Sequence, residues 1–66
     1  MQVSINGEVK ELKDGLLVSE LLEQLELKGK FVAVERNRNV VSYKDYDKTV
    51  LCDNDQLEIV TLVGGG

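Results

Sequence analysis

The clearest candidate for chemistry in this sequence is its last residue, Gly66, which follows Gly64 and Gly65. Its α-carboxylate has an unperturbed pKa of about 3.5 and is ionised at neutral pH. An ionised carboxylate resists nucleophilic attack until one oxygen becomes part of a leaving group, and adenylyl or phosphoryl transfer from ATP would provide that group. Because glycines have no side chain, a tail of this kind fits a narrow active site in another protein. The sequence therefore indicates that this C-terminal tail is a substrate for a partner enzyme. A frayed chain end or a linker can have the same glycine sequence.

Two further groups of side chains are candidates for a reactive cysteine and for a cation site. For both we favour a purely structural role. Cys52 is the single cysteine, and the acidic residues that follow it disfavour a reactive thiolate, so we expect a small buried apolar residue. Asp53, Asp55 and Glu58 lack the ligand spacing and the glycine of a calcium loop, which predicts a solvated turn.

The aromatic and basic residues of the second half are interpreted in the same way. Tyr43 and Tyr46 suit a satellite of the core better than a platform for stacking bases, since no basic groove accompanies them. Arg36 and Arg38 flank a predicted turn, and we expect both to be solvated.

The composition excludes several classes of function. The 66 residues include no histidine, which excludes histidine-based acid–base catalysis and removes the usual ligands of a structural zinc site. Eight Lys and Arg against twelve Asp and Glu give a net charge of −4, which argues against binding nucleic acid or an anionic membrane. We expect no catalytic residue, no metal and no bound cofactor. The sequence shows no signal-peptide pattern and no apolar run near the roughly 20 residues of a membrane span, and its single cysteine fits a reducing cytosol, so we expect a cytoplasmic location.

The beginning of the sequence predicts a β-hairpin. Val3 and Ile5 alternate with polar residues, as in a strand with one buried face. Asn6 and Gly7 favour a type I′ turn into a return strand over residues 8–13. The irregular apolar spacing of that return strand predicts an edge strand or a bulge.

An amphipathic helix follows the hairpin. Its apolar stripe has the spacing i, i+3, i+4 and i+7 and consists of Val18, Leu21, Leu22 and Leu25. Gly29 predicts the end of the helix, because glycine readily adopts the left-handed conformation that terminates helices.

The second half predicts short strands joined by polar turns. The expected strands cover residues 31–35, 40–41, 49–51 and 56–63, with turns at 36–39 and 53–55 and a single helical turn at 43–46 capped by Ser42. One helix between strand pairs gives a mixed sheet with the helix packed across one face, an α+β architecture of β-grasp type. The other face is left for water or a partner. We expect one domain, residues 1–63, followed by a flexible glycine tail, residues 64–66.

Strand parity predicts which residues lie on the open face of the sheet. If Glu35 and Glu58 are solvated, the side chains on their face include four apolar residues, Phe31, Ala33, Val60 and Leu62. The opposite parity turns five residues toward the helix, Val32, Val34, Leu57, Ile59 and Thr61. The four outward residues are either a partner-binding patch near the chain end or the apolar surface that a small domain cannot hide.

Four segments stand in order along the sequence: Leu21-Leu22-Glu23-Gln24-Leu25, Val32-Ala33-Val34-Glu35-Arg36-Asn37, Asp53-Asn54-Asp55-Gln56-Leu57-Glu58-Ile59-Val60 and Val63-Gly64-Gly65-Gly66. In this order and spacing they resemble the ThiS family, the ubiquitin-like β-grasp sulfur carriers of thiamine biosynthesis. The resemblance covers the whole chain. Leu17 departs from it, because the family commonly has a threonine suited to helix capping at this position.

The resemblance implies a protein that other enzymes act on and that is not itself an enzyme. Gly66 would be adenylated with ATP by a ubiquitin-activating-like adenylyltransferase of ThiF type and converted to a thiocarboxylate with sulfur from a donor protein. The thiocarboxylate would then deliver sulfur to a ThiG-type thiazole synthase. Gly64 and Gly65 would enter the partner's active site, and the patch of Phe31, Ala33, Val60 and Leu62 would be the docking surface.

Other functions on the same fold stay open at this point. The nearest is the small-subunit type of sulfur carrier in molybdopterin synthase, although those chains tend to be longer. A ubiquitin-like modifier would use Gly66 to form an isopeptide bond, whereas a non-covalent interaction module would not need Gly66 at all. In each case the free protein is expected to be a monomer.

Overall fold

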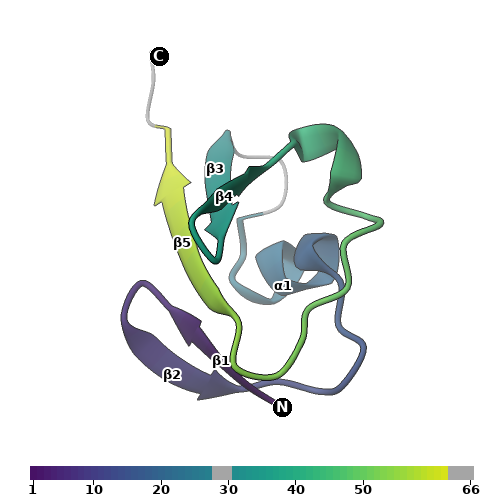
Figure 1. Cartoon of the computed structure of the whole chain (residues 1–66). Helices are drawn as coiled ribbons and strands as arrows, with labels where there is room; N and C mark the ends of the chain where they lie inside the picture. Colours follow the sequence, from purple (N-terminus) through teal and green to yellow (C-terminus); the bar gives the residue numbers. More distant parts are fainter. Residues whose placement is uncertain (28–30, 63–66) are drawn as a thin grey trace.

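The computed structural model describes residues 1–27 and 31–62 and contains one mixed five-stranded sheet with a helix across one face (Figure 1). The strands are β1 (Gln2–Ile5), β2 (Glu8–Glu11), β3 (Val32–Arg36), β4 (Asn39–Val41) and β5 (Gln56–Thr61), in the order β2-β1-β5-β3-β4, and the helix is α1 (Val18–Gln24). β1 and β5 are parallel, and the other neighbours are antiparallel. The predicted α+β sheet with one covered face is confirmed.

The β1–β2 hairpin has the turn that its sequence predicts. Asn6 and Gly7 have φ of 51° and 86°, the two positive values of a type I′ turn. β2 is an edge strand, as expected, and its register with β1 runs without a bulge. It ends at Glu11, two residues before the predicted limit.

Helix α1 is shorter than predicted. It ends at Gln24, and Glu26 already has the left-handed φ of 61° that was expected only at Gly29. Gly29 lies outside the described residues. At the start, Leu17 offers no side-chain cap, and the Glu20 carboxylate instead accepts a hydrogen bond from the Leu17 N–H at 2.9 Å.

The core lies between α1 and the sheet. Its buried residues are Val3, Ile5, Leu16, Val18, Leu21, Leu22, Val34, Leu51, Leu57 and Ile59. Three residues of the predicted helix stripe are buried: Val18, Leu21 and Leu22. The apolar side of α1 therefore faces the core, as predicted. Leu25, the fourth, is partly buried against this core.

The other predicted elements differ from the structure mainly at their ends. β3 begins and ends one residue later than expected, and β4 begins one residue earlier. The turn capped by Ser42 is a 3₁₀ helix at Tyr43–Asp45, in which the Ser42 hydroxyl accepts a hydrogen bond from the Lys44 N–H. Of the expected strand at 49–51, one antiparallel bridge between Val50 and Leu17 is present. Among the described residues, no helix has the length and apolar character needed to cross a membrane.

Candidate functional site

The four apolar residues that were predicted to lie on the open face of the sheet form one patch. We call Phe31, Ala33, Val60 and Leu62 the apolar patch. Ala33 and Val60 are direct partners in the β3–β5 ladder, and the Leu62 N–H donates to the Phe31 carbonyl at 2.8 Å. Directly opposed residues share a face of the sheet, so the four side chains lie on the face away from α1. Phe31, Val60 and Leu62 are 81%, 56% and 54% exposed. The predicted parity of the two strands is confirmed.

The inward residues of the same strands follow the prediction except at the chain end. Val34, Leu57 and Ile59 are buried, and Val32 is partly buried against the core. Thr61 lies on the helix side, where it lines a shallow hollow with Leu25, but it is exposed. The reason is that α1 ends too early to cover this end of β5.

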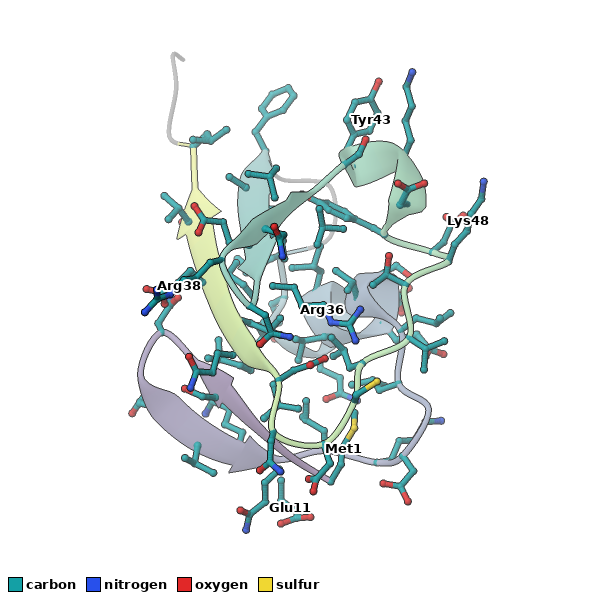
Figure 2. The ribbon with its side chains drawn as sticks, viewed as in Figure 1. Met1, Glu11, Arg36, Arg38, Tyr43 and Lys48 are labelled. Atoms are coloured by element: carbon teal, nitrogen blue, oxygen red, sulfur yellow. The ribbon has the colours of Figure 1, made fainter. Side chains whose placement is uncertain are left out.

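The apolar patch continues around the end of the sheet into a hollow of about 680 Å³, lined by Phe31, Val32, Tyr43, Tyr46 and Leu62. Both tyrosines were expected to be satellites of the core, and this is right for Tyr46. Its hydroxyl donates to the Val32 carbonyl at 3.1 Å, and burial raises its pKa. The prediction is wrong for Tyr43, which is 74% exposed and projects away from the body of the protein (Figure 2). Tyr43 begins the 3₁₀ turn, and its exposed side chain adds an aromatic ring to the lining of the hollow.

The predicted reactive end is not described by the structure. Gly64, Gly65 and Gly66 lie outside the described residues, so their roles stay predictions. What the structure places is the approach to them: β5 leads to Leu62, which belongs to the apolar patch.

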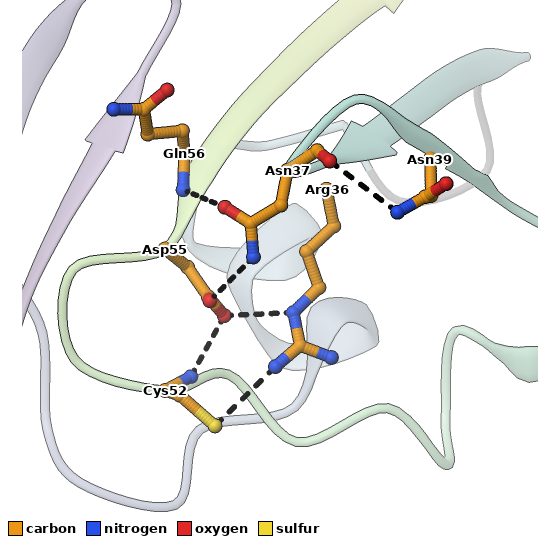
Figure 3. A network of polar contacts seen from close by, with 6 residues as sticks. All are labelled: Arg36, Asn37, Asn39, Cys52, Asp55 and Gln56. Atoms are coloured by element: carbon orange, nitrogen blue, oxygen red, sulfur yellow. Dashed lines mark hydrogen bonds and ion pairs between the residues drawn. The ribbon is translucent and has the colours of Figure 1, made fainter.

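Asp55 was expected in a solvated turn, and this prediction is wrong. The residue is 5% exposed, and its carboxylate accepts hydrogen bonds from Arg36 Nε at 2.8 Å, Asn37 Nδ2 at 3.0 Å and the Cys52 N–H at 2.8 Å (Figure 3). Burial opposes ionisation of this carboxyl, but the three hydrogen bonds and the positive charge of Arg36 outweigh it and hold its pKa below the ordinary value. Asn37 extends the network, because its Oδ1 accepts from the Gln56 N–H at 2.9 Å.

The same network corrects two further expectations. Arg36 is not simply solvated, since its guanidinium forms an ion pair with Asp55, whereas Arg38 is exposed as predicted. Cys52 is exposed rather than buried, and its Sγ lies 3.3 Å from Arg36 Nη2. The preceding Leu51 fills the core, so the chain turns the Cys52 side chain outward. Asp53 and Glu58 are exposed, as expected.

No group of His, Cys, Asp and Glu residues within 1–27 and 31–62 has the arrangement needed to hold a metal ion. The acidic residues of the predicted turn do not converge on one point, because the Asp55 carboxylate points inward to Arg36. Asp53 instead accepts a hydrogen bond from the Gln2 N–H at 2.7 Å and ties the loop to β1.

Comparison with known proteins matches the whole chain. The ThiS family model matches residues 3–66. The sulfur carrier protein ThiS of Bacillus subtilis is 42% identical over 65 residues, which cover 97% of this chain and 98% of that protein. A thiazole synthase of Paramagnetospirillum magneticum is 39% identical over 66 residues, all of this chain but only 20% of that protein. The crystal structure of a thiamine biosynthesis protein (ThiS) from Geobacter metallireducens has a TM-score of 0.84 and 32% identity, with 100% of both chains covered, which confirms the predicted β-grasp fold.

Proposed function

The chain belongs to the ThiS family, and from this premise we propose that it carries sulfur for thiamine biosynthesis as a thiocarboxylate on Gly66. It is a small sulfur carrier protein and not an enzyme. The observation that carries the proposal is the triple glycine that follows β5 in the sequence, separated by one residue from Leu62 of the apolar patch.

The chemistry follows from the reactivity of a carboxylate. A ThiF-type adenylyltransferase transfers AMP from ATP to an oxygen of the Gly66 carboxylate and releases pyrophosphate. Sulfur at the oxidation level of sulfide (HS⁻) then attacks the activated carbonyl carbon, the C–O bond to AMP breaks, AMP and a proton leave, and the thiocarboxylate remains. In this scheme ATP is consumed by the partner, a donor protein supplies the sulfur, and this chain binds no cofactor.

The domain and the tail have separate roles in this proposal. Residues 1–63 are the folded domain that partners recognise, and residues 64–66 are the tail that enters a partner's active site. The apolar patch supports this division, because it lies at the end of β5 that leads to the tail. Both the adenylyltransferase and the thiazole synthase would dock there.

Thiazole synthase is supported as a partner by the relative that carries a segment similar to this chain within its own polypeptide. Linkage of two domains in one chain raises the effective concentration of one for the other, which is useful where the two must react. We place the protein in the cytoplasm, where the activating enzyme would have ATP.

The test is an intact-mass measurement. The chain is incubated with its cognate adenylyltransferase, ATP and sulfide, and the mass should increase by one exchange of oxygen for sulfur. A variant without Gly65 and Gly66 should show no change, and the same deletion should abolish complementation of a thiamine auxotroph. An unchanged mass, with an enzyme that adenylates another carrier and releases pyrophosphate from ATP, would contradict the proposal.

The same experiments separate the alternatives on this fold. Complementation of a molybdenum-cofactor mutant instead of the auxotroph would indicate a molybdopterin-type carrier. Lysine-linked conjugates would indicate a modifier, and function that survives the deletion would indicate a non-covalent module.

A further inference from the structure

Two glutamates face each other on the open side of the sheet. Glu35 and Glu58 are direct partners in the antiparallel β3–β5 ladder, and both are exposed. Directly opposed residues of such a ladder have Cβ atoms only about 5 Å apart, and like charges in these positions destabilise the sheet. This pair therefore works against the stability of the free protein.

No ion pair with a described residue neutralises the two carboxylates. Neither carboxylate forms an ion pair or a hydrogen bond with a residue in 1–27 or 31–62. The two glutamates line a hollow of about 500 Å³, and Arg38 lines it too but forms no ion pair with either carboxylate. By contrast, Arg36 at the end of β3 forms an ion pair at 2.8 Å with Asp55, the residue before β5.

The acidic pair is continuous with the apolar patch. In the ladder register, the Glu35–Glu58 row lies two residues along from the Ala33–Val60 row, so both rows belong to one face. Val40, the β4 partner of Glu35, is 78% exposed and adds an apolar side chain on the outer side of the pair. The open face thus combines apolar contact area with a localised, unpaired negative charge.

We propose that this face docks on thiazole synthase through an arginine or lysine that the enzyme places against Glu35 and Glu58, while apolar residues of the enzyme cover the patch. The proposal rests on the proposed function. Charge complementarity argues for it, because a cation relieves a repulsion that exists only in the free carrier. The relative that joins a similar segment to thiazole synthase argues for that enzyme as the occupant.

The test measures the affinity of the full-length carrier for purified thiazole synthase by calorimetry at low and high salt. Glu58→Lys should weaken binding about tenfold or more and reduce its salt dependence, because the enzyme's cation then meets a neutral pair. The same variant should melt at a higher temperature than the wild type, since Glu35 gains an opposite charge across the ladder. Lost binding together with higher stability cannot arise from unfolding.

Glu8→Lys is the matched control. It makes the same change of charge on a strand, but Glu8 is the ladder partner of Ile5, whose side chain is buried on the helix side. Its affinity for the enzyme should stay within about twofold of the wild type. The neutral double variant Glu35→Gln, Glu58→Gln should bind as weakly as Glu58→Lys.

Two results would overturn the inference and leave the carrier function intact. One is binding by Glu58→Lys and the double variant within twofold of the wild type, which would make the docking surface apolar only. The other is a wild-type chain that gains sulfur on Gly66 but does not bind thiazole synthase. Absence of sulfur transfer to Gly66 would instead contradict the proposed function itself.

Discussion

The side chain of Asn6 and the main chain of Ile59 form a reciprocal pair of hydrogen bonds across 53 positions of sequence. Asn6 Nδ2 donates to the Ile59 carbonyl at 3.0 Å, and the Ile59 N–H donates to Asn6 Oδ1 at 2.8 Å. β1 ends at Ile5, so the amide of Asn6 takes the place that another strand residue would have against β5. One residue therefore forms the hairpin turn and also holds the strand that leads to the apolar patch.

Replacing Asn6 with alanine should lower the free energy of unfolding by about 3–4 kcal/mol. Two hydrogen bonds of about 1 kcal/mol each are lost, and alanine at a φ of 51° adds a steric cost. Glycine adopts this φ without a steric cost, so Asn6→Gly should lose only the contribution of the two hydrogen bonds to the free energy of unfolding. Urea unfolding of both variants measures the difference, and equal losses would mean that the turn conformation contributes nothing.

Replacing Asp55 with asparagine should cost about 2–3 kcal/mol, because Arg36 would lose the anion that it contacts. Asp47→Asn is the matched control at an exposed position without a hydrogen bond or ion pair to a described residue, and it should change stability by less than about 0.5 kcal/mol. Urea unfolding at neutral pH checks both values. A loss as small as that of the control would show that the network is not stabilising.

The same carboxyl predicts how stability depends on pH. Although burial alone would raise the pKa of Asp55, its hydrogen bonds and Arg36 hold it below the ordinary value of 3.8. The unfolded chain therefore takes up the proton first, and this stabilisation is present above pH 3.8 and lost as the pH falls toward the lower folded value. Urea midpoints measured down to about pH 3 should fall less steeply for Asp55→Asn than for the wild type. Parallel curves would contradict the lowered pKa.

Truncation of the apolar patch should impair partner recognition without affecting the fold. Phe31→Ala together with Leu62→Ala removes exposed side chains, so the free energy of unfolding should change by less than about 1 kcal/mol. The kcat/KM of adenylation should fall at least about tenfold, because each side chain buried at an interface contributes about 1.5–3 kcal/mol. Val50→Ala, at a position that is 48% exposed and outside the five-stranded sheet, is the control and should leave the rate unchanged. Equal rates for all three proteins would exclude the patch as the docking surface for this enzyme.

A threonine at position 17 should stabilise the start of α1. Leu17 lies at the N-cap, and its side chain has no oxygen that could accept a hydrogen bond from an N–H of the first turn. Leu17→Thr should therefore be more stable than Leu17→Val, its isosteric control, by about 1 kcal/mol. Thermal unfolding of the two variants measures the cap alone, since both lose the same apolar contacts of leucine.

Local patterns in the sequence were sufficient to predict the hairpin, the helix stripe and the parity of β3 and β5. Asn6 and Gly7 specify a turn that few other residues can adopt, and alternation along a strand fixes the direction of each side chain whatever the strand pairs with. For this reason the apolar patch could be named before the fold was known. The family could also be identified from the order of its segments along the chain.

Only the tertiary structure decided where Asp55, Cys52 and Tyr43 lie and that Glu35 faces Glu58. Asp55 is buried because Arg36 and Asn37, about 20 positions earlier, come within hydrogen-bonding distance when β5 enters the sheet between β1 and β3. The register that opposes the two glutamates is likewise a pairing of distant strands. Such contacts depend on how the chain returns on itself, and no local propensity encodes that return.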